Sequence, residues 1–461
     1  MLERQLEERI FSGVPQIGQA MRSSVIRHIA PEMLALLLIE AGLSFWLCWL
    51  LIAGATAGAS LDHVAVQHGA VVALVAAFTS FLLGAYRPAA FARIRSLVPA
   101  TALGGLLAFS IAWAMLWLLG PNLEMIVGRD PMWPTKIFLA WIGALLALRL
   151  VFQAAVRSRL FTRRVAVMGG LGAAAGTVAA IRTGHAGSFE VVPLGAEPWS
   201  AAVSLDLRAS GVRTVVVPQS AVLPTTGWGN VELLDETGFW ERHLRRVDVE
   251  HLVPAWFSAL DIKARHQLWE PVYRTADVLT SAVLLLFTLP LMLLVAVLIR
   301  LDSPGPVLYR QERIGKHSAP FVLLKFRSMN CNAEARGPAW AQQHDPRVTR
   351  IGAFIRRTRI DELPQLINVL RGEMSVIGPR PERPHFVGQL AAVIPFYGER
   401  ARVKPGLTGW AQVNFPYGAS VADARAKLSY DLYYVKYHTP ILDLMILFAT
   451  VRVILFQEGS R

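Results

Sequence analysis

Val278–Ile299, with the sequence VLTSAVLLLFTLPLMLLVAVLI, is the stretch that decides the fold. It contains no charged side chain and is close to the roughly 20 residues that a helix needs to cross a bilayer. Pro290 lies near its middle, where a proline removes a helical hydrogen bond and clashes with the preceding turn. The helix is therefore expected to kink or break at this residue.

Both flanks of this stretch are basic: Lys263, Arg265 and Arg274 precede it, and Arg300, Arg310, Arg313 and Lys316 follow it. Because Lys and Arg accumulate on the cytoplasmic side of a membrane, a span that crosses would leave one flank on the wrong side. We therefore expect a re-entrant helix over 278–299 that enters the bilayer, bends at Pro290 and returns. An ordinary kinked span is the alternative. The backbone groups freed at the break need partners, for which Thr288 is a candidate.

Four further apolar stretches lie in the first third of the chain: Met33–Ala55, Val64–Ala85, Leu97–Leu119 and Ile137–Val156. Buried core helices seldom run this far with so few charges, so the sequence predicts a four-helix transmembrane bundle. Arg149 lies near the end of the fourth stretch, from where its long side chain is expected to reach the interface. The mostly polar segment ahead of the first stretch, about 30 residues, is too long for a cleaved signal peptide.

Basic residues stand before the first stretch, between the second and third, and after the fourth: Arg4, Arg9, Arg22, Arg27, Arg87, Arg93, Arg95, Arg157, Arg159, Arg163 and Arg164. The other two connections contain only Arg129 and Lys136, offset by Glu124 and Asp130. The distribution places both ends of the bundle in the cytoplasm. Everything after about residue 157 then begins on that side of the membrane.

The composition excludes several classes of protein. The chain has 461 residues, of which 54% are hydrophobic and 17% charged, whereas soluble domains carry roughly 25% charged residues. A simple soluble enzyme, a disordered chain and a collagen-like chain are therefore not expected. The only cysteines, Cys48 and Cys331, are far apart and should be reduced, which argues against a disulfide scaffold.

The formal net charge of +13 suggests nucleic acid, an anionic membrane face or phosphorylated substrates as partners. The arginines stand beside membrane segments, and no nucleic-acid-binding module is visible. No nucleic-acid partner is expected.

Residues 161–255 alternate strand-like and helix-like segments. RRVAVMGG, SFEVVPLG and RTVVVPQ are typical of strands, and AAAGTVAAIRT and GFWERHLRR of helices, which predicts a small parallel sheet. Gly170, Gly172 and Gly176 follow the first strand with a spacing one residue longer than the dinucleotide-binding motif. No acidic residue stands at the usual interval, and Glu190 is the nearest. We expect a Rossmann-like domain with a tight glycine turn; nucleotide binding there is the less favoured alternative.

Asp361 and Glu362 form an acidic pair inside a run of arginines: Arg347, Arg350, Arg356, Arg357, Arg359, Arg371, Arg380 and Arg383. Pro364 places this pair at the start of a helix. An aspartate can attack phosphorus and form an acyl phosphate. Attack on an anionic diphosphate needs neutralising arginines and usually Mg²⁺. Arginines that bind lipid headgroups, and a helix cap with a surface salt bridge, are the alternatives.

Two loops and a strand accompany the acidic pair. The turn GPRPERP holds Arg380 and Arg383 between prolines, and such rigid guanidinium groups suit phosphate binding. The strand-like FVLLKFRSM carries Lys325 and Arg327. In KPGLTGWAQVN, Trp410 is expected to pack in the core.

Pro440–Phe456 is apolar but carries Asp443 and Arg452, so an interfacial helix is expected there rather than a span. Tyr430, Tyr433 and Tyr434 precede it and would fit a membrane-surface belt.

The carboxyl-terminal part, roughly residues 270–461, closely resembles the bacterial sugar transferase family. These are the polyprenyl-phosphate hexose-1-phosphate transferases that start exopolysaccharide and O-antigen synthesis. The motifs that carry the resemblance are KFRSM, DPRVTRIGAFIRRTRIDELPQLINVLRGEMSVIGPRPERP, KPGLTGWAQVN and YDLYYVKYHTPILDLMILF. The four-span bundle and the Rossmann-like domain are similar to those of the family's larger members, which also suggest a homodimer.

The resemblance implies a two-step reaction at the cytoplasmic face of the bacterial inner membrane. Asp361 would attack the sugar-side phosphate of a UDP-sugar and release UMP. Undecaprenyl phosphate would then take the sugar phosphate from this aspartate, giving undecaprenyl-diphosphate-sugar. Glu362 would assist with the metal or with proton transfer, and Mg²⁺ would be held by Asp361 and Glu362.

The resemblance also assigns roles to basic residues. Arg380 matches the family's phosphate-binding arginine, and Arg356 an arginine credited with the polyprenyl phosphate. Lys325 and Arg327 match a strand near the active site, and 278–299 matches the family's re-entrant helix. Two departures concern the helix break, where Leu289 replaces the usual serine before Pro290, and Arg359, which replaces a serine two residues before the pair.

The expected fold class is a membrane protein of α plus α/β type. We expect a four-span bundle over 1–160, a Rossmann-like domain over 161–255 and a catalytic domain with a re-entrant membrane helix and interfacial helices over 256–461. The expected partners are a UDP-hexose, undecaprenyl phosphate and the lipid bilayer. Two other functions stay open: a direct lipid glycosyltransferase that releases UDP, and a non-catalytic scaffold of polysaccharide assembly.

Overall fold

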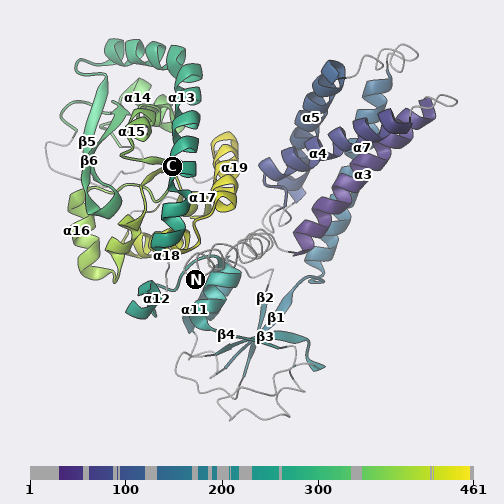
Figure 1. Cartoon of the computed structure of the whole chain (residues 1–461), viewed down its shortest axis with the longest axis horizontal. Coiled ribbons are helices and arrows are strands. Elements are labelled where there is room, and N and C mark those ends of the chain that lie inside the picture. Colours follow the sequence, from purple (N-terminus) through teal and green to yellow (C-terminus); the bar gives the residue numbers. More distant parts are fainter. Residues whose placement is uncertain are drawn as a thin grey trace, which may run out of the picture. The chain divides into compact units, whose positions relative to one another are not determined.

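The structure is a computed structural model that describes residues 31–55, 62–86, 91, 94–119, 132–168, 175–184, 189–194, 207, 209–217, 231–258, 262–333, 345–415, 418 and 420–456 (Figure 1). The chain divides into two compact units, Met1–Asp235 and Glu236–Arg461. The finer domain limits expected after residues 160 and 255 stay a prediction.

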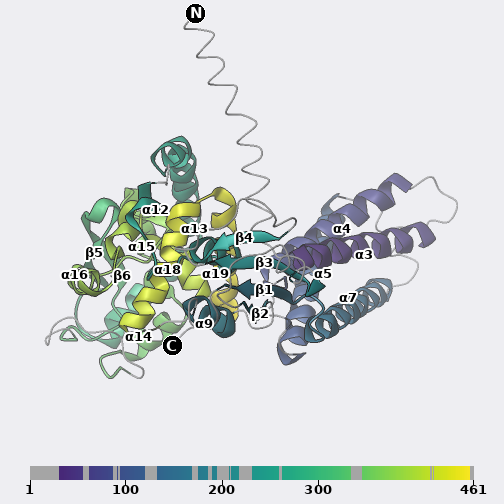
Figure 2. The same cartoon turned by 90° about the horizontal axis from the view of Figure 1, so that it is seen from below.

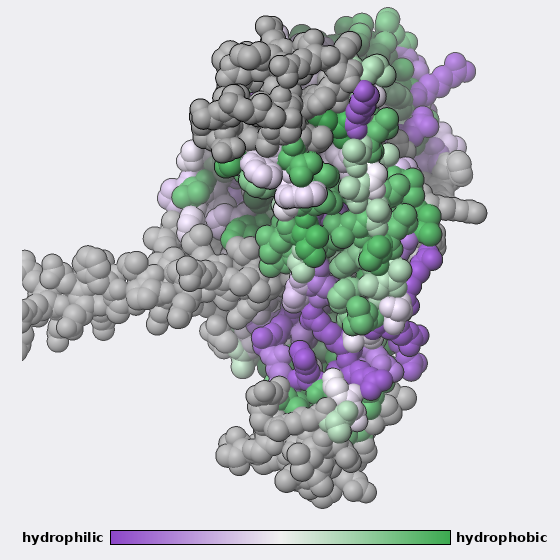
Figure 3. Space-filling model, turned by 90° about the vertical axis from the view of Figure 1, so that its right-hand side faces the viewer, coloured by the Kyte–Doolittle hydropathy of each residue, from purple (hydrophilic) through white to green (hydrophobic). Residues whose placement is uncertain are grey.

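Four helices of the first unit coincide with the four apolar stretches at its start. They are α3 (Pro31–Ala55), α4 (Asp62–Leu82), α5 (Ile94–Leu119) and α7 (Trp133–Arg157). By length and composition, α3, α5 and α7 can cross a membrane, while the apolar part of α4, Val66–Leu82, is shorter. Figure 3 shows a broad hydrophobic surface on this side of the molecule. The predicted membrane helices are thus confirmed as long apolar helices. The arginines before residue 31 and at 87, 93 and 129, used to predict orientation, lie outside the described residues.

A buried ion pair joins these helices. Arg149 on α7 contacts Glu40 on α3 through two bonds, Nε–Oε1 of 2.6 Å and Nη2–Oε2 of 2.8 Å. The same guanidinium donates to Thr101 on α5 at 3.1 Å and to Ser80 on α4 at 3.0 Å, and Tyr86 donates to Glu40 at 2.7 Å. The expectation that Arg149 reaches the interface is wrong. Only 3% of this residue is exposed, because Glu40 neutralises it within the bundle.

The second part of the first unit is a four-stranded parallel sheet, which confirms the predicted parallel topology. Its strands are β1 (Arg163–Val167), β2 (Phe189–Pro193), β3 (Val212–Val217) and β4 (Glu232–Asp235), in the order β2-β1-β3-β4. The helix α9 (Ala175–Gly184) follows β1 as expected. This strand order is that of flavodoxin-like sheets, not the 3-2-1-4 order of dinucleotide-binding folds. Gly170 and Gly172 lie outside the described residues.

The second unit begins with a short helical segment and has its largest core among its last helices. The first elements are α11 (Glu236–Phe239), the π-helical turn η2 (Trp240–Leu244) and α12 (Pro254–Ser258). The last are α16 (Pro384–Val393), η5 (Tyr397–Arg402), α17 (Trp410–Asn414), α18 (Val421–Tyr437) and α19 (Pro440–Phe456). The helix α17 packs against α18 and α19. Figure 1 labels all three helices, and Figure 2 shows α18 and α19 next to each other.

This core decides two expectations. Trp410 is buried in it, as expected. Tyr433 and Tyr434 are buried there too, with exposures of 3% and 1%, so they do not form a membrane-surface belt. Both lie on α18, on the side that faces the core. The sequence pattern could not separate packing from an interfacial position because tyrosine serves both.

The elements around the acidic pair follow a long helix. They are the antiparallel hairpin β5 (Leu308–Ile314) and β6 (Pro320–Phe326), joined through η3 (Lys316–Ser318), then α14 (Arg350–Arg357), the 3₁₀ turn η4 (Ile360–Glu362) and α15 (Gln365–Arg371). The strands β7 (Ser375–Ile377) and β8 (Gly406–Thr408) form a small parallel pair.

The long helix α13 (Ile262–Asp302) contains the decisive stretch and includes both Pro271 and Pro290. It is one helix rather than two, but Figure 1 shows it turn to a new direction before its end. Thr288 donates to the carbonyl oxygen of Leu284 at 2.7 Å, not to that of Leu286, which loses its amide partner at Pro290. The re-entrant path stays a prediction.

Candidate active site

The acidic pair lies in the 3₁₀ turn between α14 and α15. Arg359, just before this turn, has a left-handed backbone with φ of 60°, so the chain changes direction there. Both carboxylates of the pair are buried, with 8% of Asp361 and 9% of Glu362 exposed. Two adjacent acids at this depth need cationic partners or must hold protons. The two residues meet this demand differently.

Three cations surround one oxygen of Glu362. Its Oε1 lies 2.6 Å from Arg380 Nη2, 3.3 Å from Lys325 Nζ and 3.6 Å from Arg359 Nη1. Burial by itself would raise the pKa of Glu362, but Arg380 and Lys325 outweigh burial and hold this pKa well below its usual range. Glu362 is therefore an ionised carboxylate at all physiological pH values. Its charge in turn raises the pKa of Arg380.

Asp361 makes no ion pair of this kind among the described contacts, although the charges of Lys325 and Arg380 act to lower its pKa. Its Oδ1 is buried without a hydrogen bond among the described residues. Burial raises the pKa of Asp361, and the neighbouring charge of Glu362 raises it further. An unsolvated, unpaired carboxylate oxygen is a better nucleophile than one held by several hydrogen bonds, provided that it is ionised. Glu362 therefore balances the charge of the nearby cations, while the carboxylate of Asp361 is available to attack a substrate.

Lys325 extends from β6 towards the pair. Burial lowers the pKa of this lysine below its usual value, with Glu362 acting in the opposite direction. A buried lysine next to two acids supplies a positive charge at the place where an anionic phosphate would have to approach them.

The turn at 378–384 presents Arg380. A side chain at Gly378 would approach the carbonyl oxygen of Lys404 to 2.3 Å, so glycine is required for the close contact between this turn and β8. Arg313 on β5 donates to the carbonyl oxygen of Pro381 at 2.9 Å. Burial lowers the pKa of Arg313 to about 10. The turn is therefore held from both sides.

The structure brings some of the predicted site residues together and not others. Lys325 and Arg380 both contact Glu362. Arg327 is buried and donates instead to the carbonyl oxygens of Ser303 at 2.6 Å and Pro304 at 2.8 Å, behind the end of α13. Among the described contacts, Arg327 therefore holds the loop after α13.

The remaining two arginines have no described bond to the pair. Arg356 is half-buried at the end of α14. Arg383 directly precedes α16, with its guanidinium 5.9 Å from the ring centre of Phe386. Their predicted roles towards phosphates stay predictions.

Sequence reasoning missed Arg400. Its Nη2 donates to the carbonyl oxygen of Arg380 at 2.9 Å and lies 2.7 Å from Oδ2 of the buried Asp431. This ion pair supports the backbone of Arg380 from behind. The stretch YGERARVKPG looks like a solvated, charged loop, and its acidic partner stands on a different helix, so the sequence contained no signal for it.

The acidic pair also fits the predicted Mg²⁺. This ion takes carboxylate oxygens, often only one or two from the protein, and completes its shell with water and substrate phosphates. The Asp361 carboxylate, whose Oδ1 has no described partner, would offer one oxygen to the ion and keep the other for attack. Glu362 Oε1 already balances three cations, so Asp361 would be the main protein ligand.

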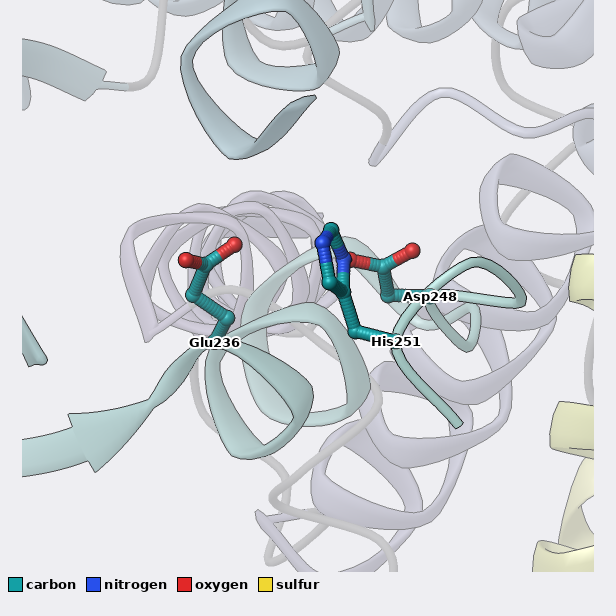
Figure 4. Close-up of side chains that lie close together, drawn as sticks. All are labelled: Glu236, Asp248 and His251. Atoms are coloured by element: carbon teal, nitrogen blue, oxygen red, sulfur yellow. The ribbon is translucent and has the colours of Figure 1, made fainter. Parts of the chain in front are cut away.

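A different group of three potential ligands occurs at the start of the second unit (Figure 4). It is the one such group within the described ranges, and it consists of Glu236, Asp248 and His251, with ligand atoms within 4.8 Å of one another. Figure 4 shows the imidazole of His251 between the two carboxylates. His251 Nδ1 lies 2.7 Å from Asp248 Oδ2, a hydrogen bond that raises the pKa of the histidine. Asp248 also accepts from the amide of Glu250 at 3.1 Å, so the contacts are those of a closed turn.

Comparison with known proteins bears on residues that form this site. The family model described as bacterial sugar transferase matches residues 268–457. This range contains α13, the β5–β6 hairpin, the acidic pair and the turn with Arg380.

Three relatives are similar to this part of the chain. The UDP-N-acetylgalactosamine-undecaprenyl-phosphate N-acetylgalactosaminephosphotransferase of Aeromonas hydrophila is 44% identical over 246 residues, which is 49% of this chain and 58% of that protein. The exopolysaccharide production protein PSS of Rhizobium leguminosarum is 45% identical over 187 residues, 39% of this chain and 92% of the relative. The UDP-glucose:undecaprenyl-phosphate glucose-1-phosphate transferase of Caulobacter vibrioides is 44% identical over 189 residues, 41% of this chain and 71% of the relative.

The match thus spans over half of the first relative and nearly all of the second. The range matched by the family model includes Lys325, Arg359 and Arg380, which form ion pairs with Glu362. The chain belongs to the bacterial sugar transferase family.

Proposed function

We propose that this protein transfers a hexose 1-phosphate from a UDP-sugar to undecaprenyl phosphate, giving undecaprenyl-diphosphate-sugar and UMP. The observation that carries the proposal is the asymmetric acidic pair: Glu362 is neutralised by three cations, while Asp361 keeps an unbonded oxygen beside the same cations. The names of the relatives supply the donor and acceptor classes.

In the first step, Asp361 attacks the sugar-side phosphorus of the donor. A bond forms between the carboxylate oxygen and phosphorus, and the bond from this phosphorus to the bridging oxygen breaks, so UMP leaves with the electron pair. In the second step, an oxygen of undecaprenyl phosphate attacks the same phosphorus and releases Asp361 as a carboxylate. Each step exchanges one P–O bond for another and needs no other reactant.

The surrounding residues serve this exchange by their charge. Lys325 and Arg380 neutralise the phosphate oxygens as the anionic nucleophile approaches, and Glu362 holds both cations in place. Mg²⁺, held mainly by Asp361, would supply further neutralisation of the diphosphate. Arg356 and Arg383 are proposed to bind phosphate groups of the substrates.

We further propose that α13 is re-entrant and that the catalytic unit faces the cytoplasm at the bacterial inner membrane. Residues near both ends of the apolar stretch of α13 contact other elements of the second unit. Arg274 donates to the carbonyl oxygen of Val369 at 2.6 Å, and Asp277 accepts from the amide of Val376 at 2.8 Å, while Val295 and Ile299 pack with Phe326 and Ile355. Lys316 Nζ lies 3.2 Å from Glu270 Oε1, which joins the two basic flanks directly.

The middle of α13 has the opposite character. Leu286 and Phe287 are 70% and 77% exposed, an arrangement that is unfavourable in water and favourable in lipid. The apolar stretch contacts the second unit at both of its ends, and its middle is exposed. This arrangement fits a path into the bilayer and back. The homodimer suggested by the large relatives is also a proposal, which light scattering of the purified protein would test.

Incubation of the membrane-embedded protein with radiolabelled UDP-sugars, Mg²⁺ and undecaprenyl phosphate tests the proposed function. UMP release with label in the lipid fraction is expected. Release of UDP would indicate the direct glycosyltransferase, and no turnover with any UDP-sugar would favour the scaffold. Asp361→Asn should abolish UMP release, and activity at the wild-type level in this variant would overturn the nucleophile assignment.

A further inference from the structure

Asn368, in the second turn of α15, is fully buried and uses all of its amide atoms. Its Oδ1 accepts from the backbone amide of Leu324 at 3.0 Å. Its Nδ2 donates to the carbonyl oxygen of Val322 at 2.7 Å and to Oε2 of Glu373 at 2.6 Å. The side chain therefore accepts one bond from and donates one bond to the β6 backbone on either side of Leu323. It donates a third bond to Glu373, which follows α15.

These bonds place the amide on the open edge of the β5–β6 hairpin. The hairpin is a two-stranded sheet, so β6 pairs with β5 on one side and has no strand on the other among the described residues. An amide side chain carries the same donor and acceptor groups as a backbone peptide. Asn368 thus takes the place that a residue of a third strand would occupy, and it fixes α15 to β6 in a defined register.

The two elements joined in this way each carry half of the Lys325–Glu362 contact. Lys325 follows Leu324 directly on β6, and Glu362 belongs to the turn that leads into α15. The two charged atoms, Lys325 Nζ and Glu362 Oε1, are 3.3 Å apart. A shift of one residue or a rotation of α15 against β6 would separate them.

We propose that Asn368 is a positioning residue that sets the separation of Lys325 and Glu362, and through it the placement of the cations beside Asp361. This inference rests on the proposed function, because it assigns a catalytic consequence to the contact. Leucine at this position would offer none of these bonds, and aspartate would replace the donor with an acceptor that faces Val322 and Glu373.

The test compares Asn368→Leu and Asn368→Asp with the wild-type protein, full length and in membranes, with UDP-glucose and UDP-N-acetylgalactosamine as donors and undecaprenyl phosphate as acceptor. For both variants, kcat for UMP release should fall about tenfold to a hundredfold, the effect of a small misplacement of catalytic groups. The KM for the donor should change less than about twofold, because Asn368 is not at the substrate surface.

The rate per folded molecule separates positioning from general destabilisation. Positioning by Asn368 predicts a lower kcat for each folded molecule, because the Lys325–Glu362 contact is displaced while the chain stays folded. A merely structural role predicts a smaller folded fraction with an unchanged kcat for each folded molecule.

Two control variants complete the design. Glu373→Gln keeps an acceptor for Asn368 and leaves both bonds to β6, so kcat for each folded molecule should equal that of the wild type. Leu442→Ala creates a cavity in the core around α18 and α19 and should lower thermal stability without changing kcat for each folded molecule. If Asn368→Leu keeps the wild-type kcat for each folded molecule, or if Leu442→Ala lowers it equally, the positioning role is overturned. If the wild-type protein itself releases no UMP, the proposed function fails instead.

Discussion

Arg380 Nη2 lies 2.6 Å from Glu362 Oε1 and links the proline-bounded turn to the acidic pair. This bond uses one of the two Nη atoms of the guanidinium group. Arg400 donates to the backbone carbonyl oxygen of Arg380. Arg380 therefore approaches the pair in one fixed direction.

Replacement of Arg380 by lysine should show how much this direction matters. Arg380→Lys keeps the charge but loses the planar fork, so kcat/KM for UMP release should fall roughly a hundredfold, as for loss of one preorganised electrostatic donor. Arg371→Lys, an exposed arginine at the end of α15, is the matched control and should stay near the wild-type rate. Equal rates for Arg380→Lys and wild type would mean that only charge is needed.

The pH range in which kcat/KM for the donor is maximal should be narrower than the range set by an aspartate and a lysine with ordinary pKa values. Asp361 attacks only when ionised, and its pKa is raised, so activity should fall on the acidic side at a pH above the usual aspartate range near 3.9. Lys325 acts when protonated, and its pKa is lowered, so activity should fall on the alkaline side below the usual lysine range near 10.4. In Lys325→Arg the alkaline limb should vanish, because guanidinium does not titrate there. A limb unchanged in this variant would assign it to another group.

Asp361→Asn should be more stable than the wild type at neutral pH although it is inactive. The pKa of Asp361 is raised in the folded protein, so its ionised form destabilises the fold above that pKa, by about 1.4 kcal/mol for each unit of the rise. The gain should shrink as the pH falls and Asp361 takes up its proton. Thermal unfolding in detergent between pH 4 and 8 measures this.

Asp345→Asn should show the opposite sign when the same unfolding experiment is extended down to pH 2. A hydrogen bond from Arg347 lowers the pKa of Asp345 to about 2, so its carboxylate contributes stability above the unfolded pKa near 3.9. This variant should lose stability at neutral pH, and the difference should disappear as the pH falls towards 2. A stability gain in both variants would show that the effect is not electrostatic.

The Glu40–Arg149 pair should show strong coupling in a double-mutant cycle. Glu40→Met or Arg149→Met alone leaves a buried charge without its partner and should cost about 3–5 kcal/mol, whereas the double variant should recover most of this loss. Leu74→Ala, at a position that is 72% exposed on the bundle, is the control for a change of apolar area. If the stability losses of the two single variants add up in the double variant, Glu40 and Arg149 are not energetically coupled and the prediction is wrong.

Cysteine labelling tests the path of α13. In a background with Cys48→Ser and Cys331→Ser, a membrane-impermeant maleimide should reach Val272→Cys and Leu301→Cys from the same side, since these positions are 51% and 78% exposed at the two ends of the apolar stretch. Ala57→Cys, in the first predicted outer loop, should react from the opposite side. Labelling of positions 272 and 301 from different sides would establish a crossing span.

The sequence predicted the elements far better than the contacts between them. The helices α3, α5 and α19 and the strands β1, β2 and β3 lie where hydropathy and alternation place them, because these patterns report burial of a local face. The strand β4 was missed, since ELLD is short and half polar.

The wrong predictions for the positions of individual side chains have a common cause. Arg149 and Tyr434 each combine an apolar body with a polar end, and such side chains suit an interface as well as a satisfied interior position. Their partners, Glu40 and Asp443, stand on other helices, and a single sequence contains no record of which distant residues pair.

In the candidate site, too, the sequence predicted some residues but not the contacts that support them. The approach of Lys325 and Arg380 to Glu362 agrees with the motifs, which place all three in the predicted site. Arg400 donates to the backbone of Arg380, and Asn368 bonds to the backbone of Val322 and Leu324, next to Lys325. No residue type or spacing in the sequence marks such contacts, so only the three-dimensional structure shows them.

The Glu40–Arg149 ion pair between α3 and α7 has a consequence for biosynthesis. Glu40 and Arg149 are 109 residues apart, and a ribosome that adds about 5–20 residues per second needs roughly 5–20 s to make the second after the first. During this time the acid has no counter-ion, at a cost of the order of 3 kcal/mol for a charge in the lipid core. The helix α3 must therefore wait at the translocon, or insert with Glu40 protonated, until α7 emerges.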